Sequence, residues 1–256
     1  MKFWTDFRPA TGVLAVLVGF LAVGAAAQTT NILSDAEIQG RQLAQQLCDA
    51  RPADNFTNKG VLQIRDGNGN RTNYSMTCEI ALTPSLTPTN WCSIYTSSAM
   101  KPWDEHLVIG HVNKTSSFYE HYESSVASAQ ILPSSEFSPF ANSDFWLCDL
   151  GLEFFHWPQQ KVLPKTTNLK RGRDYTLLES TNPNPATTGY SRVLTWIDKE
   201  SGGILEAEAY DFNGKLLKDF APKSFKKVNG QWELQEMEIR NVQTGSRTRL
   251  EFDLKK

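Results

Sequence analysis

Four cysteines and four histidines are the side chains of this sequence with the most chemistry open to them. The cysteines are Cys48, Cys78, Cys92 and Cys148. No two of them form a C-x-x-C pair, which argues against a zinc site or a thiol redox centre. In an exported chain an even number of cysteines permits two disulfides, with three ways of pairing. Free buried thiols are the alternative, and the spacing leaves both open.

The histidines follow no pattern that binds a metal or activates a nucleophile. They are His106, His111, His121 and His156. None belongs to an H-E-x-x-H motif, and the chain has no G-x-S-x-G, Walker A or G-x-G-x-x-G motif. His111 and His121 could be neighbours on adjacent strands, but ordinary sheet histidines are the simpler interpretation. We therefore predict no metal site, no cofactor and no enzyme.

Two acidic patterns are better explained as solvated surface residues than as a catalytic or a calcium-binding site. Glu206 and Glu208 share one face of a predicted strand, where paired carboxylates are usually solvated and are not arranged as in a glycosidase. The turn at 66–70 reads Asp-Gly-Asn-Gly-Asn, like the start of a calcium loop. Its sixth position would be Arg71 in place of Gly and its twelfth Thr77 in place of Glu, which excludes an EF-hand site.

An aromatic segment between Ile131 and Pro164 is the strongest sign of a binding function. Prolines interrupt it, and so many large rings in an irregular stretch need something to bury them. Two interpretations are open: a plug that fills an ordinary core, or a lid over the mouth of an apolar cavity. The candidate cavity or lid residues are Phe140, Phe145, Trp146, Phe154, Phe155 and Trp157, joined by Trp91 and Trp196 from the sheet.

Local signals in this segment predict a short helix followed by a short strand. A helix capped at Ser143-Asp144 is expected to run through Leu150 and to end at Gly151. The residues 153–157 look like a strand. On a strand the adjacent rings of Phe154 and Phe155 would point to opposite faces, so they could not both line one cavity.

The scaffold is predicted most clearly between Gly189 and Leu254. Apolar and polar residues alternate there, which indicates antiparallel strands with one buried and one solvated face. Residue pairs that accept positive φ mark the hairpin turns. The expected turns are Asn213-Gly214, Asn229-Gly230 and Thr244-Gly245. If such a meander curls, its concave face becomes a cavity that is either filled by side chains or open to a ligand.

The N-terminal part predicts one helix and further strands. Ser34 and Glu37 form a capping box that opens a helix ending near Asp49. A helix that precedes the strands suits a cap on the concave side of the sheet. The other strands are expected at 60–65, 71–82, 91–97, 107–112, 116–122 and 174–179.

The first 27 residues have the three parts of a signal peptide. Lys2 and Arg8 precede an uncharged apolar run, and an A-x-A pattern ends at Ala27. The apolar core is short for a membrane span, so we expect 1–27 to be removed and 28–256 to form a single exported domain. The formal net charge of −2 gives no reason to expect nucleic acid as a partner. The basic residues from Arg240 to Arg249 alternate with acids and are interpreted as a solvated sheet face.

Two stretches near the C-terminus resemble the outer-membrane lipoprotein-sorting proteins, the LolA-like exported proteins that include the treponemal lipoprotein-like domain. They are GYSRVLTWIDKESGGILEAEAYDFNGKLLKDF and FKKVNGQWELQEMEIRNVQTGSRTRLEF. Upstream, GVLQIRDGNGNRT resembles the opening hairpin, and NSDFWLCDLGLEFFHW stands where the family has a G-T-D-F-S-Y-E-D-L-like stretch. The resemblance covers roughly Asn58 to Leu254. The N-terminal motifs of the lipoprotein carrier itself are absent.

This resemblance implies a mainly β, α+β fold. The expected architecture is a curved antiparallel half-barrel sheet, with an N-terminal helix and a short helical lid on its concave face. The implied function is a monomeric periplasmic carrier or binding protein for lipoprotein acyl chains or other lipids. An inner-membrane transporter and an outer-membrane acceptor are the candidate partners. The alternative is a sensor or an accessory subunit of an envelope transport complex, on the same fold but with a filled concave face.

Overall fold

The computed structural model describes residues 33–82, 91–99, 101–111, 116–125, 127–228 and 230–254. The chain divides into two compact units, Met1–Ile32 and Leu33–Lys256, and the described residues all belong to the second. The predicted signal peptide (1–27) lies outside the described residues, as do Val112 at the end of one predicted strand and Asn229 of one predicted turn. The boundary at residue 27 therefore stays a prediction.

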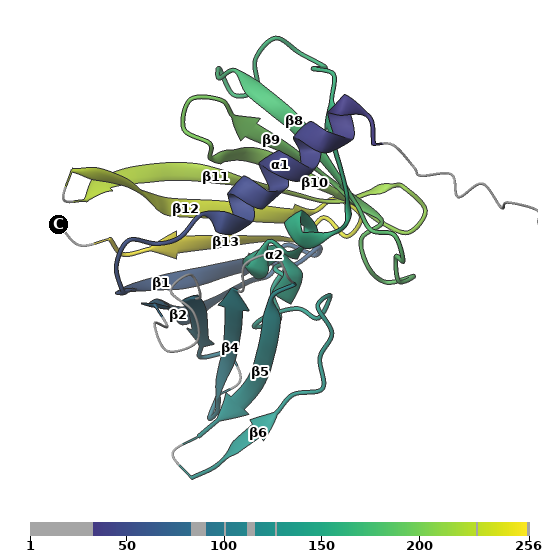
Figure 1. The fold of residues 1–256 in the computed structure, drawn as a ribbon. Helices are drawn as coiled ribbons and strands as arrows, with labels where there is room; N and C mark the ends of the chain where they lie inside the picture. The colour runs from purple at the N-terminus through teal and green to yellow at the C-terminus, as the bar shows by residue number, and fades with distance from the viewer. Residues whose placement is uncertain are drawn as a thin grey trace, which may run out of the picture. The chain divides into compact units, whose positions relative to one another are not determined.

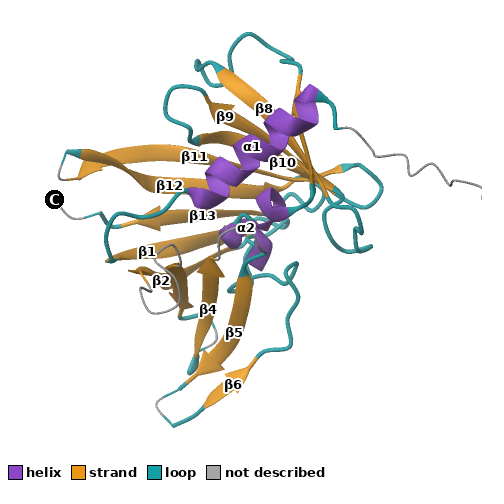
Figure 2. Ribbon diagram, viewed as in Figure 1, coloured by secondary structure: helices purple, strands orange, loops and turns teal. Residues whose placement is uncertain are grey.

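The described residues form one antiparallel sheet of thirteen strands with few helices (Figure 2). The helices are α1 (Asp35–Asp49), α2 (Leu147–Gly151) and the 3-10 helix η1 (Glu153–His156). The strands are β1 (Phe56–Arg65), β2 (Arg71–Leu82), β3 (Trp91–Ser97), β4 (Asp104–His111), β5 (Phe118–Ser124), β6 (Ala129–Ile131), β7 (Gln159–Leu163), β8 (Tyr175–Thr181), β9 (Arg192–Asp198), β10 (Ile204–Tyr210), β11 (Leu216–Val228), β12 (Gln231–Asn241) and β13 (Arg247–Phe252).

Two meanders make up the sheet. The strand order is β6-β5-β4-β3-β2-β1-β13-β12-β11-β10-β9-β8-β7, so neighbours in the sheet are neighbours in the chain except at β1 and β13. There Gly60 pairs with Phe252 and Arg65 with Arg247. The predicted fold class, a mainly β protein with an open, curved antiparallel sheet and helices on one face, is confirmed (Figure 1).

We call the face that α1, α2 and η1 cover the inner face, and the opposite one the outer face. Alternation along each strand places the core on the inner face. In β10, for example, Ala207 and Ala209 are fully buried, and in β13 Leu250 is buried between exposed or half-exposed neighbours. One continuous apolar cluster runs from Leu107 of β4 to Leu178 of β8 and includes Ala44 of α1.

Helix α1 begins at the predicted capping box. The Ser34 hydroxyl accepts a hydrogen bond from the backbone N–H of Glu37, and the Glu37 carboxylate accepts one from the N–H of Ser34 at 2.8 Å. Gly40 then lets the helix touch β7 directly. A Cβ at this position would lie 2.5 Å from the backbone nitrogen of Lys161, so no larger residue fits without moving the helix.

The aromatic segment differs from its prediction in local structure. Its helix α2 begins at Leu147, with Trp146 as the N-terminal cap, so the predicted cap at Ser143-Asp144 is wrong. The helix ends at Gly151, as predicted, and the following residue Leu152 adopts a left-handed conformation with φ of 52°. The predicted strand at 153–157 is wrong, because these residues form η1. In that 3-10 turn Phe154 and Phe155 both reach the core, at 0% and 4% exposure, so the expectation that they must face apart is wrong as well.

Candidate functional site

The aromatic segment fills the centre of the inner face. Phe140, Phe145 and Phe154 are at most 1% exposed. The ring of Phe154 lies 4.6 Å from that of Phe155 and 6.2 Å from that of Phe220 on β11, in the edge-on and tilted arrangements that aromatic pairs prefer. These rings pack as a core does, which matches the plug interpretation of the segment.

A buried ionic cluster fastens this segment to the sheet. Lys218 of β11 is 1% exposed, and its Nζ donates to the carbonyl oxygen of Asp144 at 2.7 Å. The same nitrogen lies 3.4 Å from Oδ2 of Asp149 and 3.4 Å from the ring centre of Trp146. Tyr190 donates its hydroxyl to Asp149 at 2.9 Å. Burial lowers the pKa of Lys218, and the nearby carboxylate of Asp149 opposes that shift.

Two further buried carboxylates hold the same segment. Asp144 accepts a hydrogen bond from Thr248 of β13 at 2.9 Å. Glu105 of β4 accepts one from the backbone N–H of Ala141 at 2.9 Å and lies 2.7 Å from Nε2 of His121. Since each contact joins a buried group on the segment to a different strand, the segment is tied to both halves of the sheet.

Glu153 of η1 makes a fourth attachment and brings a pH dependence. Its carboxyl group accepts hydrogen bonds from the hydroxyl of Tyr119 at 3.0 Å and from the backbone N–H of Ser117 at 3.2 Å. Burial nevertheless raises the pKa of Glu153 to about 7, because these two donors and the hydroxyl of Ser116 offset only part of the cost of desolvating the charge.

Replacing Glu153 by glutamine is expected to flatten the pH dependence of stability. Because folding raises the pKa of this acid, its favourable contribution is complete below its ordinary pKa and is lost as the pH rises through about 7. The glutamine side chain keeps an oxygen for both donors and never ionises. At about pH 8 the variant should exceed the parent in free energy of unfolding by up to about 3 kcal/mol, with little difference at about pH 5. Urea titrations at both pH values measure this, and Glu120→Gln on β5 is the exposed control. A difference in free energy of unfolding between variant and parent that does not change with pH would contradict this prediction.

Trp157 and Trp91 lie at the rim of the inner face and are half-buried. Trp157 follows η1, and its ring centre is 6.4 Å from that of Phe154. Trp91 stacks on His111 with ring centres 3.7 Å apart, and burial lowers the pKa of that histidine to about 4. His111 and His121 are not neighbours, contrary to one interpretation above, because the β4–β5 register pairs His121 with Leu107.

Trp196 lies on the wrong face for the predicted role. Val193 and Ile197 of β9 point into the inner core, whereas Trp196 packs with Tyr175 and Leu177 in a separate cluster on the outer face. The Nζ of Lys170 lies 3.9 Å above its ring. Strand alternation separates Trp196 from the other candidate residues, so its assignment to the cavity is corrected.

The four cysteines are all free thiols, so the disulfide alternative is not the one in the structure. Cys78 faces inward on β2, opposite Tyr95, and Cys92 points outward on β3. The Sγ of Cys48 on α1 contacts Nδ1 of His156 at 3.7 Å, and Cys148 is buried in α2. Burial raises the pKa of both Cys48 and Cys78 to about 12, which makes them poor nucleophiles.

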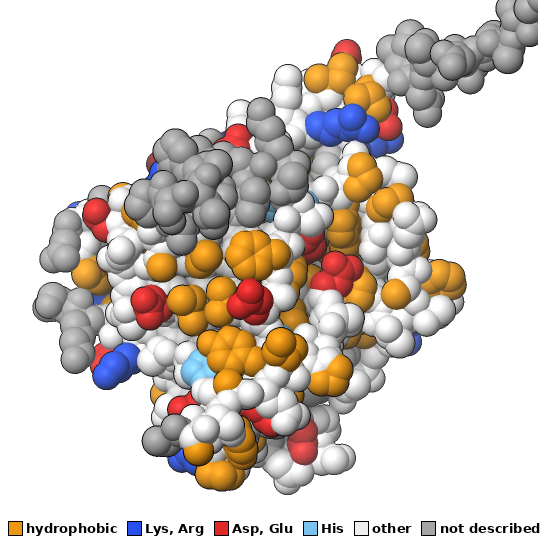
Figure 3. All heavy atoms as spheres, turned by 60° about the horizontal axis from the view of Figure 1, so that its bottom comes forward, with side chains coloured by type: hydrophobic (Ala, Val, Ile, Leu, Met, Phe, Trp, Pro, Cys, Tyr) orange, Lys and Arg blue, Asp and Glu red, His pale blue; other side chains and the backbone are white. Residues whose placement is uncertain are grey.

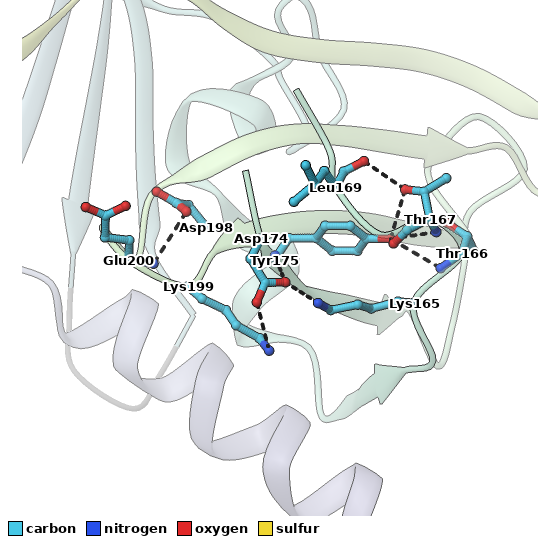
Figure 4. A network of polar contacts seen from close by, with 9 residues as sticks. All are labelled: Lys165, Thr166, Thr167, Leu169, Asp174, Tyr175, Asp198, Lys199 and Glu200. Carbon is cyan, nitrogen blue, oxygen red and sulfur yellow. Dashed lines mark hydrogen bonds and ion pairs between the residues drawn. The ribbon is translucent and has the colours of Figure 1, made fainter. Parts of the chain in front are cut away.

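Two shallow hollows on the described surface are charged, and neither is an acyl site. One lies on the outer face and is lined by Arg171, Glu206, Asp219, Ala221, Lys223, Glu238, Arg240 and Arg247. The other lies between the β7–β8 loop and the β9–β10 turn, where Asp174 bridges Lys165 and Lys199 and the Tyr175 hydroxyl accepts backbone N–H groups from Thr166 and Thr167 (Figure 4). Figure 3 shows one face of the molecule, at whose centre hydrophobic side chains gather with acidic side chains among them.

Within the described ranges, no three His, Cys, Asp or Glu side chains are placed to hold a metal ion. No helix of the described residues is long and apolar enough to cross a membrane.

The polar attachments were missed by sequence reasoning. One of them had a signal: Lys218 stands two residues before the buried Phe220, at a core-facing position of β11, where it pairs with the buried Ala209. A lysine in a core-facing row needs an acceptor. The identity of that acceptor, Asp149 on a segment far away in the chain, has no signature in the alternation pattern.

The architecture defines a class of protein: an open, curved antiparallel sheet whose inner face is covered by an N-terminal helix and a fastened aromatic segment. A DUF1329 family protein from Desulfovibrio piger is similar in fold, with a TM-score of 0.69 and 19% identity, over 86% of this chain and 92% of that one. A domain from Vibrio parahaemolyticus named for outer membrane lipoprotein sorting has a TM-score of 0.67 and 18% identity, over 85% and 92%. A LolA superfamily protein from Nitrosomonas europaea has 0.59 and 15%, over 86% and 93%.

These likenesses show the fold, which is LolA-like, and they confirm the predicted resemblance. A family model described as "Uncharacterized protein" matches residues 106–255, more than half of the sequence, and the chain belongs to that family. No curated protein matches the chain.

Proposed function

We propose that the protein is a periplasmic lipid- or lipoprotein-binding protein that takes acyl chains beneath α1, on the inner face of the sheet. The LolA-like fold supports this, as does its likeness to a domain named for outer membrane lipoprotein sorting. The predicted signal peptide supports the location. Transfer between membranes would need an inner-membrane donor and an outer-membrane acceptor, and a monomer suffices for a carrier.

The observation that carries the proposal is the difference between the two covers of the inner face. The aromatic segment is fastened by the buried ion pair of Asp149 with Lys218 and by hydrogen bonds that Asp144 and Glu153 accept. On α1 only Gly40 and Ala44 are buried. The helix is therefore the part that can lift from the sheet, while the aromatic rings stay as the floor of the site.

The free energies favour this exchange of cover. Lifting α1 exposes its half-buried apolar stripe, Leu43, Leu47 and Cys48, at a cost of about 1.5–3 kcal/mol for each large side chain. An acyl chain of ~16 carbons gains about 0.8 kcal/mol per buried methylene, or on the order of 12 kcal/mol. The gain exceeds the cost, and the half-buried ring of Trp157 lies at the opening.

A thiol pair can test whether α1 must lift. The Sγ of Cys48 contacts the imidazole of His156, with Nδ1 3.7 Å away, so His156→Cys puts a second thiol on η1 facing Cys48 of α1. The oxidised variant should lose uptake of a fluorescent fatty acid, and reduction should restore it. Cys48→Ala/His156→Cys, which cannot form the bond, is the control. Equal uptake by the oxidised and reduced forms would show that α1 is not the gate.

The fatty-acid titration also tests the rim. Trp157→Ala should weaken binding about tenfold, the equivalent of about 1.4 kcal/mol, because the ring covers the acyl chain. Trp232→Ala, at a position 71% exposed on β12, should leave the affinity unchanged. Native mass spectrometry of protein purified with its lipids would then name the class of cargo.

The filled inner face favours a second candidate: a sensor or accessory subunit that binds a protein partner and takes no lipid. Its supporting observation is that Phe140, Phe145 and Phe154 already occupy the space at core-like burial. A protein that carries no lipid after purification and takes up no fatty acid would favour this candidate over the carrier.

A further inference from the structure

Four arginines form a row across four neighbouring strands, which we call the arginine row. The register pairs Arg71 of β2 with Arg65 of β1, Arg65 with Arg247 of β13, and Arg247 with Arg240 of β12. Directly paired residues point to the same side of a sheet. The adjacent Ile239 is fully buried on the inner face, so the arginine row lies on the outer face.

Three of the four arginines in this row make no ion pair with a described residue, although Arg240 and Arg247 line the outer-face hollow together with Asp219 and Glu238. Arg240 pairs with Asp219 at 2.6 Å, but in the part of the chain that the structure describes Arg65, Arg71 and Arg247 make no ion pair. Like charges directly opposite on neighbouring strands are destabilising, and Arg247 has an arginine on both sides. The next row of the outer face is different, because there Arg249 pairs with Glu238. The interpretation of the basic residues on this face as interleaved with acids holds for Arg249 and for Arg240, whereas Arg247 makes no ion pair with a described residue.

The row lies where strands meet their turns. Arg65 and Arg71 flank the β1–β2 turn, and Arg240 and Arg247 stand at the two sides of the β12–β13 turn. The β10–β11 turn touches the latter, because Gln243 donates a hydrogen bond to Asp211 at 2.9 Å. Next to Asp211 the ring of Phe212 is 49% exposed. An exposed aromatic ring therefore stands on a turn at the same end of the sheet as the cations.

We propose that the arginine row docks the protein on the phosphate headgroups of an anionic membrane surface, with Phe212 at the interface. Neighbouring strands are about 4.8 Å apart, so the row extends for about 14 Å. One small anion would contact two of the four guanidinium groups, whereas a plane of phosphates contacts them all. Arginine suits phosphate because its planar fork donates two parallel hydrogen bonds. Aromatic rings favour the boundary between headgroups and acyl chains.

The row also has a definite end. Along the same line of paired residues, Asp219 follows Arg240 on β11 and Glu208 follows on β10. The formal net charge of −2 gives no general attraction to a long polyanion. The docking surface is on the opposite face from the proposed acyl site, so a failure of lipid binding at that site would not contradict the docking proposal.

Vesicle sedimentation of the purified protein tests the docking surface. We expect binding to vesicles of phosphatidylcholine with phosphatidylglycerol that exceeds binding to phosphatidylcholine alone and weakens with added salt. Arg65→Gln/Arg247→Gln should reduce binding to the anionic vesicles about thirtyfold, roughly fivefold for each cation. The control is Arg41→Gln/Lys101→Gln, which removes the same charge from exposed positions away from the row. Phe212→Ser should weaken binding without changing its dependence on salt.

The thermal midpoint separates docking from a structural role. Because Arg247 is flanked by like charges, Arg65→Gln/Arg247→Gln should keep or raise the midpoint of unfolding, whereas a structural row would lose stability. Equal binding to both vesicle types, or an equal loss in the row variant and its control, would overturn the proposal. Row-dependent retention on heparin without vesicle binding would also overturn it and point to an acidic macromolecule.

Discussion

Lys218→Met should lower the free energy of unfolding by about 3–5 kcal/mol, among the largest effects we expect from a single substitution. The methionine roughly keeps the volume of the side chain but removes the ammonium group that lies 3.4 Å from Oδ2 of Asp149 and donates to the carbonyl of Asp144. Asp149, 4% exposed, would keep only neutral donors such as Tyr190. Removing one partner of a buried pair is costly because the other charge stays buried. Urea denaturation gives the value.

A double variant and an exposed pair complete that experiment. Lys218→Met/Asp149→Asn removes both charges and should recover a large part of the loss. Arg240→Met breaks the exposed pair with Asp219 and should cost no more than about 1 kcal/mol. If Lys218→Met and Arg240→Met cost the same, the buried cluster does not fasten the aromatic segment, and the distinction between a fixed floor and a movable α1 loses its support.

Phe154→Ala should cost about 3–5 kcal/mol, because the substitution leaves a cavity among closely packed rings. Phe154 is fully buried, and its ring contacts those of Phe155 and Phe220 on two different elements. The loss is expected in the absence of fatty acid, since the floor of the proposed site is already packed as a core.

The matched control is Phe225→Ala on β11, where the ring is 53% exposed and the expected loss is within about 0.5 kcal/mol. Thermal and urea unfolding of both variants provide the comparison. A small loss at Phe154 would mean that the rings are loosely held, which would restore the interpretation of the segment as a lid.

The scaffold could be predicted because its information is local. Alternation in the last strands, Gly214 and Gly245 at the hairpin turns, and the capping box at Ser34 each depend on residues a few positions apart. β2 and β3 even begin and end at the predicted residues. At 153–157 the local signals are weak. The run of aromatic residues there suggests a strand, but these residues form η1, because contacts with the sheet beneath them decide how the rings are buried.

The candidate site was only partly predictable, because it depends on contacts distant in the chain. Phe140, Phe145, Phe154 and Phe155, which the sequence groups as cavity or lid residues, share one cluster on the inner face, whereas Trp196, expected with them, lies on the outer face. The arginine row can be recognised only from the register of four strands. Two of them, β1 and β2, come early in the sequence, and the other two, β12 and β13, come at its end. A one-residue slip in any of those pairings would break the row.

The junction between β1 and β13 also sets the order in which the molecule can assemble. Each meander pairs strands adjacent in the chain, so both meanders can form by closing short loops. The pairing of Gly60 with Phe252 joins residues far apart in the sequence and is expected to form later. Until then β1 presents an unpaired edge of backbone donors and acceptors. Folding should therefore pass through a stage with two formed halves, in which β13 of a second copy competes for β1. Dilution of the refolding chain should raise the yield of monomer relative to swapped pairs, because it slows only the bimolecular reaction.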